Sequence, residues 1–369
     1  MREKKEKVFI GLSGGVDSSV AAAILQKEGY DVTGVFIRVW QPPFLPCTWK
    51  EDRLDAMRVA AHLDIPFLTM NFEKEYKKEV VDYMIDAYKR GLTPNPDVMC
   101  NRTIKFGAFW REAVKMGALH VATGHHARTR KIENKRSNIK NYRLLKGVDE
   151  GKDQSYFLWT LTQKQLQKTL FPVGEYEKSD VRKMAEEFGL HTAQKKDSQG
   201  LCFVGKLNMR DFLKHFIEEK RGDVLNVGGE VIGWHEGAYF YTLGQRHGFT
   251  ITKKGAHDTP YYIVGKNIEH NTLAISHKKT SGVVANTKRK VTIKNTNWIA
   301  DTPLVGKKIY AARVRYRQPL QQCTVKNISD DEATIVFDEP QLIPAGQSLV
   351  LYDGEECLGG GIMKQQAAI

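Results

Sequence analysis

The chain has 369 residues, enough for two or three domains of ordinary size. With 27% charged and 41% apolar residues it can build a packed core, which excludes a wholly disordered protein. Its 56 basic residues against 43 acidic ones give a net charge of +13, which suits a polyanionic partner. No apolar run reaches the roughly 18 residues of a membrane span, and the charged start leads directly into a predicted strand. We therefore expect a cytoplasmic protein that does not bind membranes.

The first 200 residues alternate short apolar runs with helical patterns. We expect strands at residues 8–10, 32–39, 66–70 and 120–124, and helices at residues 18–28, 53–63, 75–90 and 104–116. This alternation is typical of right-handed βαβ units on a parallel sheet. The sequence therefore predicts an α/β protein with a Rossmann-type N-terminal domain over residues 1–206.

The pattern changes from about residue 222, where β-type runs separated by Gly, Asn and Asp become dominant. We expect strands near residues 229–233, 261–264, 272–275, 290–293, 311–316 and 334–337. This predicts two small β-rich domains, a central one over residues 207–277 and a barrel-like one over residues 278–369.

Basic residues gather in two places. Residues 128–143 hold seven basic residues and one acidic residue, in what we interpret as a loop or hairpin. Residues 281–326 hold ten basic residues against Asp301. A single run of this kind is usually a solvated face, but two runs in separate domains favour contact with a long polyanion such as RNA.

A turn rich in Gly and Ser, Ser13–Ser19, lies between the first predicted strand and the first predicted helix. Gly14 and Gly15 allow the backbone to approach an anion closely, and the amide groups at the start of the following helix favour negative charge. Asp17 could hold Mg²⁺ or cap the helix. The turn has no lysine and is therefore not a Walker A loop. We predict that it binds phosphate.

Five cysteines are present, namely Cys47, Cys100, Cys202, Cys323 and Cys357. Their odd number, wide spacing and lack of a CxxC pair argue against a disulfide framework and against a four-ligand zinc site. Cys323 and Cys357 lie among β-type residues and are expected in the core. The polar surroundings of Cys100 and Cys202 predict accessible thiols, and we assign no role to Cys47.

Further motifs follow the turn in a fixed order: NPDVMCN at 95–101, IKF at 104–106, ATGH at 122–125, KDQSYFL at 152–158, KDSQGLCFVG at 196–205, YTLGQRHG at 241–248, VRYRQ at 314–318 and LGGGI at 358–362. Together with SGGVDSS, they make the chain resemble the bacterial tRNA-specific 2-thiouridylases (MnmA/TrmU family), which belong to the ATP-pyrophosphatase (PP-loop) superfamily. The resemblance extends over about residues 8–363. It implies an adenine nucleotide alpha hydrolase-like N-terminal fold and a sulfurtransferase that converts ATP to AMP and pyrophosphate. The implied product is tRNA thiolated at C2 of the wobble uridine (position 34), through an adenylated uridine.

The resemblance also implies a nucleotide site. ATP, accompanied by Mg²⁺, would bind to Gly11, Leu12, Ser13, Gly14, Gly15, Val16, Asp17 and Ser18. Ile37 would contact the adenine, and Gly124 would lie against the nucleotide. No separate set of metal ligands is expected.

By the same resemblance, Cys202 would receive a persulfide from a sulfur-relay protein or a cysteine desulfurase. Cys100 would attack that persulfide or release sulfide from it, which would leave a transient Cys100–Cys202 disulfide. Asp97 would be the general acid or base. The implied tRNA contacts are Asn95, Pro96, Asp97, His125, Lys152, Asp153, Gln154, Arg315, Tyr316 and Gln347. We expect the chain to act as a monomer on the anticodon loop and stem.

Two other functions fit the phosphate-binding turn. A small-molecule ligase of the argininosuccinate synthetase or amidotransferase type would use the same turn, but it needs neither paired thiols nor basic runs on separate domains. A non-catalytic RNA-binding module would not need Ser13, Asp17, Asp97, Cys100 and Cys202 all to be present.

Overall fold

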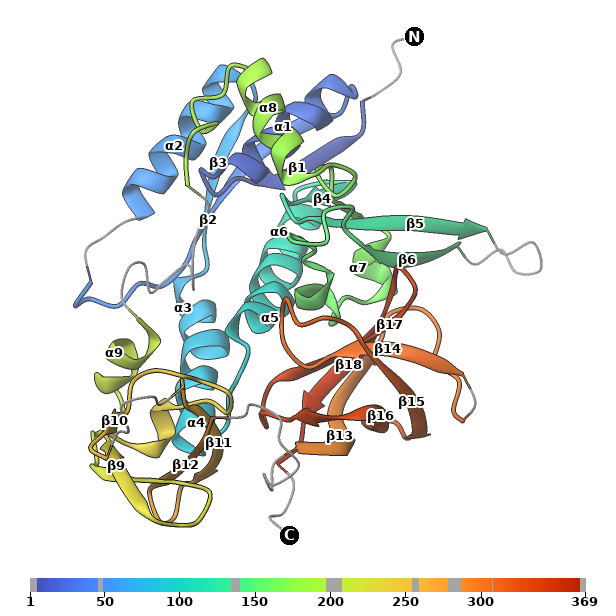
Figure 1. The fold of residues 1–369 in the computed structure, drawn as a ribbon. Helices are drawn as coiled ribbons and strands as arrows, with labels where there is room; N and C mark the ends of the chain where they lie inside the picture. The colour runs from blue at the N-terminus through green and yellow to red at the C-terminus, as the bar shows by residue number, and fades with distance from the viewer. Residues whose placement is uncertain are drawn as a thin grey trace.

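The computed structural model describes residues 5–45, 49–133, 140–196, 208–253, 259–277, 287–306 and 308–365. Three sheets are arranged around a pair of long helical segments (Figure 1). None of the helices in these ranges is both long and apolar enough to cross a membrane.

The N-terminal sheet has five parallel strands in the order β3-β2-β1-β4-β7. Their bounds are β1 Lys7–Gly11, β2 Asp31–Arg38, β3 Phe67–Asn71, β4 His120–Ala122 and β7 Thr169–Leu170. One face is covered by α1 (Val16–Lys27), α2 (Trp49–His62) and α8 (Lys178–Glu187), which bury Val8 and Ile10. Phe9 points to the other face and its separate core. The predicted parallel sheet and its four predicted strands are confirmed.

The strand order reverses between β1 and β4. From β1 the chain winds through β2 to β3 in one direction, while β4 pairs with the opposite edge of β1. In open parallel sheets, ligands bind at such a reversal, beyond the carboxyl ends of the strands. The loops that follow β1 and β4 meet at this point.

Two helical segments cover the other face of the sheet and run toward the β-rich domains (Figure 1). The first comprises α3 (Glu73–Tyr76), η1 (Lys77–Asp82) and α4 (Tyr83–Lys89), and the second α5 (Pro96–Cys100), η2 (Asn101–Phe109) and α6 (Trp110–Lys115). In both segments the middle stretch is a π-helix. Such stretches are rare and often occur at functional sites.

The second segment begins eight residues before the start at Ile104 that the sequence predicted, so that prediction was wrong. Asn95 caps the helix by accepting the amide N–H of Val98 at 3.2 Å, and Pro96 occupies the first helical position. Both are favourable residues for a helix start. The polar stretch before Ile104, which was not predicted to be helical, forms the first part of this helix.

The central β-rich domain packs against the end of these segments. It contains α9 (Met209–Lys214), β8 (Gly222–Leu225), β9 (Val231–His235), η4 (Ala238–Phe240), β10 (Thr250–Ile251), β11 (Tyr262–Asn267) and β12 (Thr272–Ser276). Its sheet has the order β10-β9-β8-β12-β11. Phe212, Tyr241 and Ile263 share one core with Val80 and Met84 of the first segment, so the two parts have a common hydrophobic interior.

The C-terminal strands form a closed barrel, which confirms the predicted barrel-like domain. Its strands are β13 Thr287–Trp298, β14 Ile309–Arg313, β15 Gln321–Ile328, β16 Glu332–Leu342, β17 Ser348–Asp353 and β18 Glu356–Met363. The order is β13-β16-β15-β14-β17-β18, and β18 pairs with β13 to close the ring.

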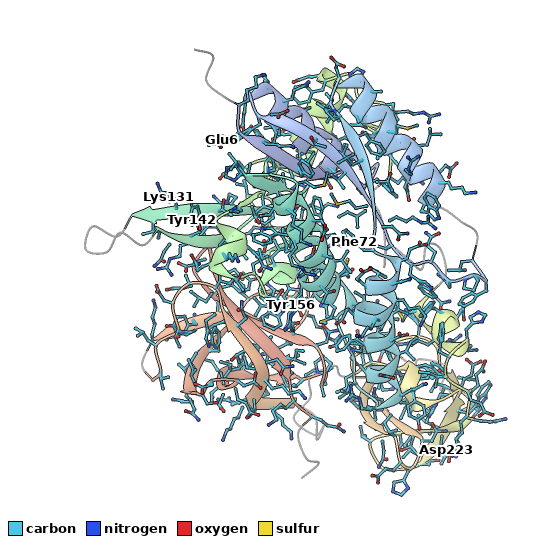
Figure 2. All side chains as sticks on the ribbon, turned by 180° about the vertical axis from the view of Figure 1, so that it is seen from behind. Glu6, Phe72, Lys131, Tyr142, Tyr156 and Asp223 are labelled. Atoms are coloured by element: carbon cyan, nitrogen blue, oxygen red, sulfur yellow. The ribbon has the colours of Figure 1, made fainter. Side chains whose placement is uncertain are left out.

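A hairpin from the first half of the chain extends this barrel. Strand β6 (Lys140–Lys146) pairs with β18, with Leu145 opposite Glu356, and β5 (Ala127–Glu133) pairs with β6. The described part of the basic stretch is therefore a hairpin, one of the two forms that the sequence allowed, and residues 134–139 lie outside the described ranges. The short elements η3 (Ser155–Leu158) and α7 (Gln163–Leu166) follow it. Figure 2 shows Lys131 and Tyr142 on the hairpin, and Tyr156 closer to the barrel.

Candidate active site

The turn after β1 has the backbone geometry of an anion site. Gly14 has a φ of +75°, and a β-carbon there would lie 2.5 Å from the main-chain oxygen of Asp52, so glycine is required. Gly15 precedes α1 and no side chain caps this helix, which leaves amide groups of its first turn available to a ligand. The hydroxyls of Ser18 and Ser19 donate to the Gly15 carbonyl at 3.1 and 2.8 Å and hold the turn.

The loop after β4 lies directly on this turn. A β-carbon on Gly124 would lie 2.6 Å from the amide nitrogen of Ser18 and 2.7 Å from the carbonyl carbon of Asp17. Ile37 on β2 is close to the start of the same turn, because its Cδ1 would lie 3.8 Å from a β-carbon on Gly11. The structure thus brings together the predicted nucleotide residues of β1, β2 and β4.

Asp17 is held by two side chains that the sequence analysis did not connect with it. The ammonium group of Lys178 and Nε2 of His126, the latter at 3.4 Å, both contact its Oδ1. Burial by itself would raise the pKa of Asp17, but the hydrogen bond from His126 and the charge of Lys178 lower that pKa below its ordinary value. Asp17 is therefore an anchored carboxylate and not a helix cap.

A second group of polar side chains connects the loop after β4 to η2. His125 is buried, its Nδ1 is 2.7 Å from the Thr123 hydroxyl, and its Nε2 is 3.5 Å from Nζ of Lys105. Lys105 lies on η2, in the same helical segment as Asp97. Burial raises the pKa of the Asp97 carboxyl, and the positive charge of Lys105 acts in the opposite direction. These residues link the nucleotide turn to α5.

The structure corrects one sequence prediction at Cys100, where we expected an accessible thiol. Cys100 is the last residue of α5, is only 6% exposed and packs in the same core as Ile104 and Phe109. Because the polar stretch around it is helical, its side chain falls on the inward face of the helix. The buried positions predicted for Cys323 and Cys357 are confirmed.

Cys202 and Cys47 lie outside the described residues, and so does the predicted Cys100–Cys202 disulfide. The described range before Cys202 ends at residue 196, and the side chain of Lys195 is held by two carboxylates. Its ammonium group contacts Asp52 at 3.0 Å and Asp55 at 2.8 Å, next to the nucleotide turn. Lys195, near the end of this described range, therefore lies beside the phosphate-binding turn.

Two predicted tRNA residues from distant parts of the chain meet at the start of α5. The Asn95 amide group donates to Oε1 of Gln347 at 3.5 Å, and Nε2 of Gln347 donates to the Pro94 carbonyl at 3.0 Å. The hydroxyl of Tyr156 lies 3.5 Å from the same Gln347 oxygen. Gln347 thus joins the barrel to the helix cap.

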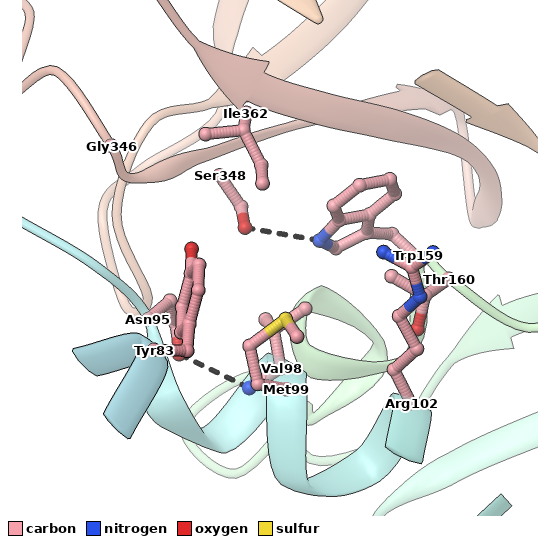
Figure 3. A pocket seen from close by; sticks show the side chains of 10 residues that line it. All are labelled: Tyr83, Asn95, Val98, Met99, Arg102, Trp159, Thr160, Gly346, Ser348 and Ile362. Carbon is pink, nitrogen blue, oxygen red and sulfur yellow. Dashed lines mark hydrogen bonds between the residues drawn. The ribbon is translucent and has the colours of Figure 1, made fainter. Parts of the chain in front are cut away.

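A small pocket opens beside this junction, between α5 and the barrel (Figure 3). It is lined by Tyr83, Asn95, Val98, Met99, Arg102, Trp159, Thr160, Gly346, Ser348 and Ile362. Its volume is about 10 Å³, close to the space that one water molecule needs. A nucleobase cannot enter it in this conformation.

The remaining predicted tRNA residues lie in different surroundings. Tyr316 is partly exposed and its ring contacts that of Phe157 in a tilted arrangement, with 4.4 Å between ring centroids. Arg315 donates to the Leu243 carbonyl of the central domain. Asp153 is only 2% exposed, and its carboxylate accepts the N–H groups of Gly147 and Ser155.

Asp153 and its neighbour Gln154 make contacts within the protein. Arg313 lies 3.6 Å from the second oxygen of Asp153. Gln154 accepts the N–H of His126 at 2.9 Å and so supports the Asp17 site. Pro96 and Lys152 are partly exposed. Among the residues predicted to contact tRNA, Asp153 and His125 are buried and are therefore shielded from direct contact with a bound RNA.

Two arginines of the basic hairpin are neutralised within the protein. Arg128 contacts Glu355 at 3.0 Å, and Arg143 contacts Glu356 at 2.8 Å as well as Asp301. Within the described ranges, no group of three or more His, Cys, Asp or Glu side chains is placed to hold a metal ion.

Comparison with known proteins shows which families the three parts of the chain match. The sequence matches the tRNA methyl transferase HUP domain over residues 6–206, the tRNA methyl transferase PRC-barrel domain over residues 210–277 and the aminomethyltransferase beta-barrel domain over residues 288–363. A solved structure of the U34-tRNA thiolase NcsA from Methanococcus maripaludis has a TM-score of 0.34 and 18% identity, covering 54% of this chain and 61% of that one; this likeness is too low to support an argument.

Curated relatives match almost the whole chain. It is 43% identical over 364 residues to the tRNA-specific 2-thiouridylase MnmA of Bacillus subtilis (strain 168), covering 98% of this chain and 95% of the relative. It is 44% identical over 363 residues to the protein of the same name from Streptococcus equi subsp. zooepidemicus (strain H70), covering 97% and 95%. The chain therefore belongs to the tRNA-specific 2-thiouridylase family.

Proposed function

We propose that this chain thiolates C2 of the wobble uridine (position 34) of tRNA, using ATP and a persulfide sulfur. One observation carries the proposal. The uncapped turn after β1 and the loop after β4 touch at the strand reversal, and Lys105 with His125 connects them to the helix of Asp97 and Cys100. These contacts support a single site for the nucleotide chemistry and the thiol chemistry.

The phosphates of ATP would lie on the turn formed by Ser13, Gly14 and Gly15, where the amide groups at the start of α1 offer hydrogen bonds. Both internal contacts of Asp17 are to Oδ1, so its carboxylate could hold Mg²⁺ together with the phosphates. The metal ion would neutralise phosphate charge when bound. Ile37 and Gly124 would border the rest of the nucleotide.

In the first step, O2 of the uracil attacks the α-phosphorus of ATP. The new O–P bond forms as the bond from the α-phosphorus to pyrophosphate breaks, and N3 of the base loses its proton. We assign that proton to Asp97, whose burial raises its pKa and makes it a better base than a solvent-exposed carboxylate. The oxygen at C2 has then become part of a good leaving group.

In the second step, sulfur replaces that oxygen. The thiolate of Cys100 attacks the inner sulfur of the Cys202 persulfide, which forms the Cys100–Cys202 disulfide and releases hydrosulfide. Hydrosulfide adds to C2, and AMP leaves with the original oxygen. An external thiol reductant regenerates both cysteines. Since Cys100 is buried, this step requires a rearrangement that uncovers its sulfur.

The tRNA would approach the side of α5 that faces the barrel. An anticodon loop presents unstacked bases, so moving one of them into the site costs little free energy. Lys152, Arg315 and Tyr316 are partly exposed and would contact the RNA, while Asn95 and Pro96 would border the target base. A sulfur-relay protein or a cysteine desulfurase would supply the persulfide.

A direct test incubates the protein with a tRNA transcript that has an unmodified wobble uridine, ATP, Mg²⁺ and a sulfide source. Mass spectrometry of the digested nucleosides should detect 2-thiouridine, and chromatography of the nucleotides should detect one AMP for each thiolated base. Formation of ADP in place of AMP would contradict the proposed adenylation.

The division of labour between the two cysteines can be tested with Cys202→Ala. We expect this variant to transfer the AMP group of α-labelled ATP to tRNA but to form no 2-thiouridine when a persulfide donor supplies the sulfur. Cys323→Val, which changes a core cysteine of β15, should thiolate normally and serves as the matched control. Full thiolation by Cys202→Ala would show that the sulfur follows another route.

A further inference from the structure

Lys105 occupies a position that the proposed mechanism leaves without a role. It lies in the π-helical stretch η2, after Asp97 in the same helical segment and opposite the loop that follows β4. Its Nζ is 3.5 Å from Nε2 of His125. Burial raises the pKa of Asp97, and the positive charge of Lys105 acts in the opposite direction. Lys105 therefore contacts the loop that follows β4 from the helical segment that carries the proposed base.

The hydrogen bonds around His125 define which way Lys105 donates. Burial, followed by the charges of Lys105 and His126, holds the pKa of His125 well below its ordinary value, so the imidazole is neutral. A neutral ring that accepts from Lys105 at Nε2 carries its proton on Nδ1, where it donates to the Thr123 hydroxyl at 2.7 Å. The bond to Thr123 fixes the ring and leaves Nε2 as the acceptor that faces the Lys105 ammonium group.

The main chain around His125 connects this contact to the nucleotide turn. Gly124 stands between Thr123 and His125, and it packs against the backbone of Asp17 and Ser18. The residue next to His125 in the chain therefore packs against the turn on which we propose that the nucleotide binds. The two remaining N–H groups of the ammonium are free of this contact and can serve a substrate.

We propose that Lys105 is a further catalytic residue, whose ammonium group donates to a non-bridging oxygen of the α-phosphate while the uracil oxygen adds to it. The inference rests on the proposed function, because it concerns the adenylation step. During that step the O–P bond forms, pyrophosphate departs and the proton from N3 passes to Asp97. Lys105 keeps its own protons and stabilises the charge that develops on phosphorus-bound oxygen.

A purely structural role for Lys105, as a partner of His125, makes different predictions. Loss of a structural contact would loosen the loop after β4 and weaken ATP binding, and any substituent that fills the space would restore it. Loss of a catalytic cation would slow the chemical step while leaving substrate binding nearly intact, and only another cation would restore the rate.

The test compares Lys105→Met, Lys105→Gln and Lys105→Arg in single-turnover transfer of the AMP group from α-labelled ATP to tRNA. We expect the Met and Gln variants to lose about 10²–10³-fold in rate, with ATP and tRNA affinities within about threefold of the wild type. Lys105→Arg should recover at least about tenfold of the loss. Lys115→Met, an exposed lysine on α6 paired with Glu112, is the matched control and should match the wild type.

A pH profile provides an independent reading. Lys105 is the charged group that acts on the pKa of Asp97, and the charges of Lys105 and His126 act on the pKa of His125. Removal of the positive charge lets the pKa of Asp97 rise, so the ascending limb of the rate profile should move to higher pH in Lys105→Met. Lys105→Arg should leave that limb near its wild-type position.

The outcomes separate the two proposals. If the wild-type protein transfers no AMP group to tRNA, the proposed function fails irrespective of Lys105. If the wild type is active and Lys105→Met retains its rate within about threefold, or if Met and Arg variants fail equally through weakened ATP binding, the role of Lys105 is overturned. Thermal unfolding of each variant detects a general folding defect, and the Gln and Arg variants then decide the question.

Discussion

Asp17 shows how a motif residue obtains its partners from distant parts of the chain. Lys178 contacts it across 161 positions and His126 across 109. Both partners are mostly buried, so the carboxylate is held in a fixed position within the phosphate-binding turn. The anchored carboxylate places a fixed negative charge in the turn. Phosphates can bind next to this charge only if a cation or the helix amides compensate for it.

This ion pair can be tested with Lys178→Met. We expect the free energy of unfolding at pH 7 to fall by about 1.5–3 kcal/mol, because a charged hydrogen bond to a partly buried carboxylate is lost. The pKa of Asp17 in the folded protein lies below its ordinary value of 3.8. The stabilisation is therefore complete above about pH 4 and is lost as the pH falls through the folded-state pKa.

Urea unfolding at pH 7 and at pH 3 measures the difference between the variant and the wild type. That difference should shrink at the lower pH, and an equal difference at both values would contradict the ion pair. Lys183→Met on the same helix removes an exposed pair with Asp180 and should cost no more than about 1 kcal/mol.

At the level of elements, the second helical segment decides how the site is built. In the π-helical stretch, a β-carbon on Gly107 would lie 2.8 Å from the main-chain oxygen of Arg102, five residues earlier. Alanine normally stabilises a helix relative to glycine. Here the close carbonyl reverses that expectation, since the neighbour is backbone and cannot turn aside.

We therefore expect Gly107→Ala to lower the free energy of unfolding by about 1–3 kcal/mol, as overpacking does elsewhere. Chemical denaturation measures this directly. Because η2 also positions Lys105, AMP transfer to tRNA should slow in the same variant at a temperature where it remains folded. A stabilised and fully active Gly107→Ala protein would show that the wide helical turn is not needed.

The same segment shows what could be predicted from the sequence and what could not. The parallel sheet followed from its apolar runs, and Ser13–Ser19 identified the phosphate-binding turn because glycine and helix-start chemistry are local. Asn95 and Pro96 carried a helix-start signal that the sequence analysis missed. The burial of Cys100 followed from that helix. The contacts of Lys178 and Lys105 could not be predicted, because only the tertiary fold brings such residues to their partners.

At the level of the whole molecule, the hairpin β5–β6 joins the N-terminal domain to the barrel. Arg143, whose side chain is 16% exposed, contacts Asp301 and Glu356 on the barrel side. Arg130 is 59% exposed on the same hairpin and reaches Glu355 only at 3.9 Å. The partly buried Arg143 therefore serves the docking of the hairpin, while the exposed Arg130 remains accessible to a phosphate.

Matched variants separate these two roles. Arg143→Met should accelerate hydrogen exchange of the β6 amides while leaving the salt dependence of tRNA binding unchanged. Arg130→Met should leave exchange unchanged and reduce the slope of the logarithm of tRNA affinity against the logarithm of salt concentration by about one. If Arg143→Met alone altered the salt slope, the hairpin would be oriented toward the RNA differently.

The pairing of β6 with β18 also has a consequence for synthesis of the protein. Leu145 of β6 can pair with Glu356 of β18 only after that residue has left the ribosome, about 210 residues later. At 5–20 residues per second, the outer edge of β6 stays unpaired for roughly 10–40 s in each newborn chain. During that interval the exposed strand edge is open to pairing with another nascent chain. Strand β18, the last described strand to be translated, therefore pairs with the open edge of the β5–β6 hairpin, which is the first described hairpin to be translated.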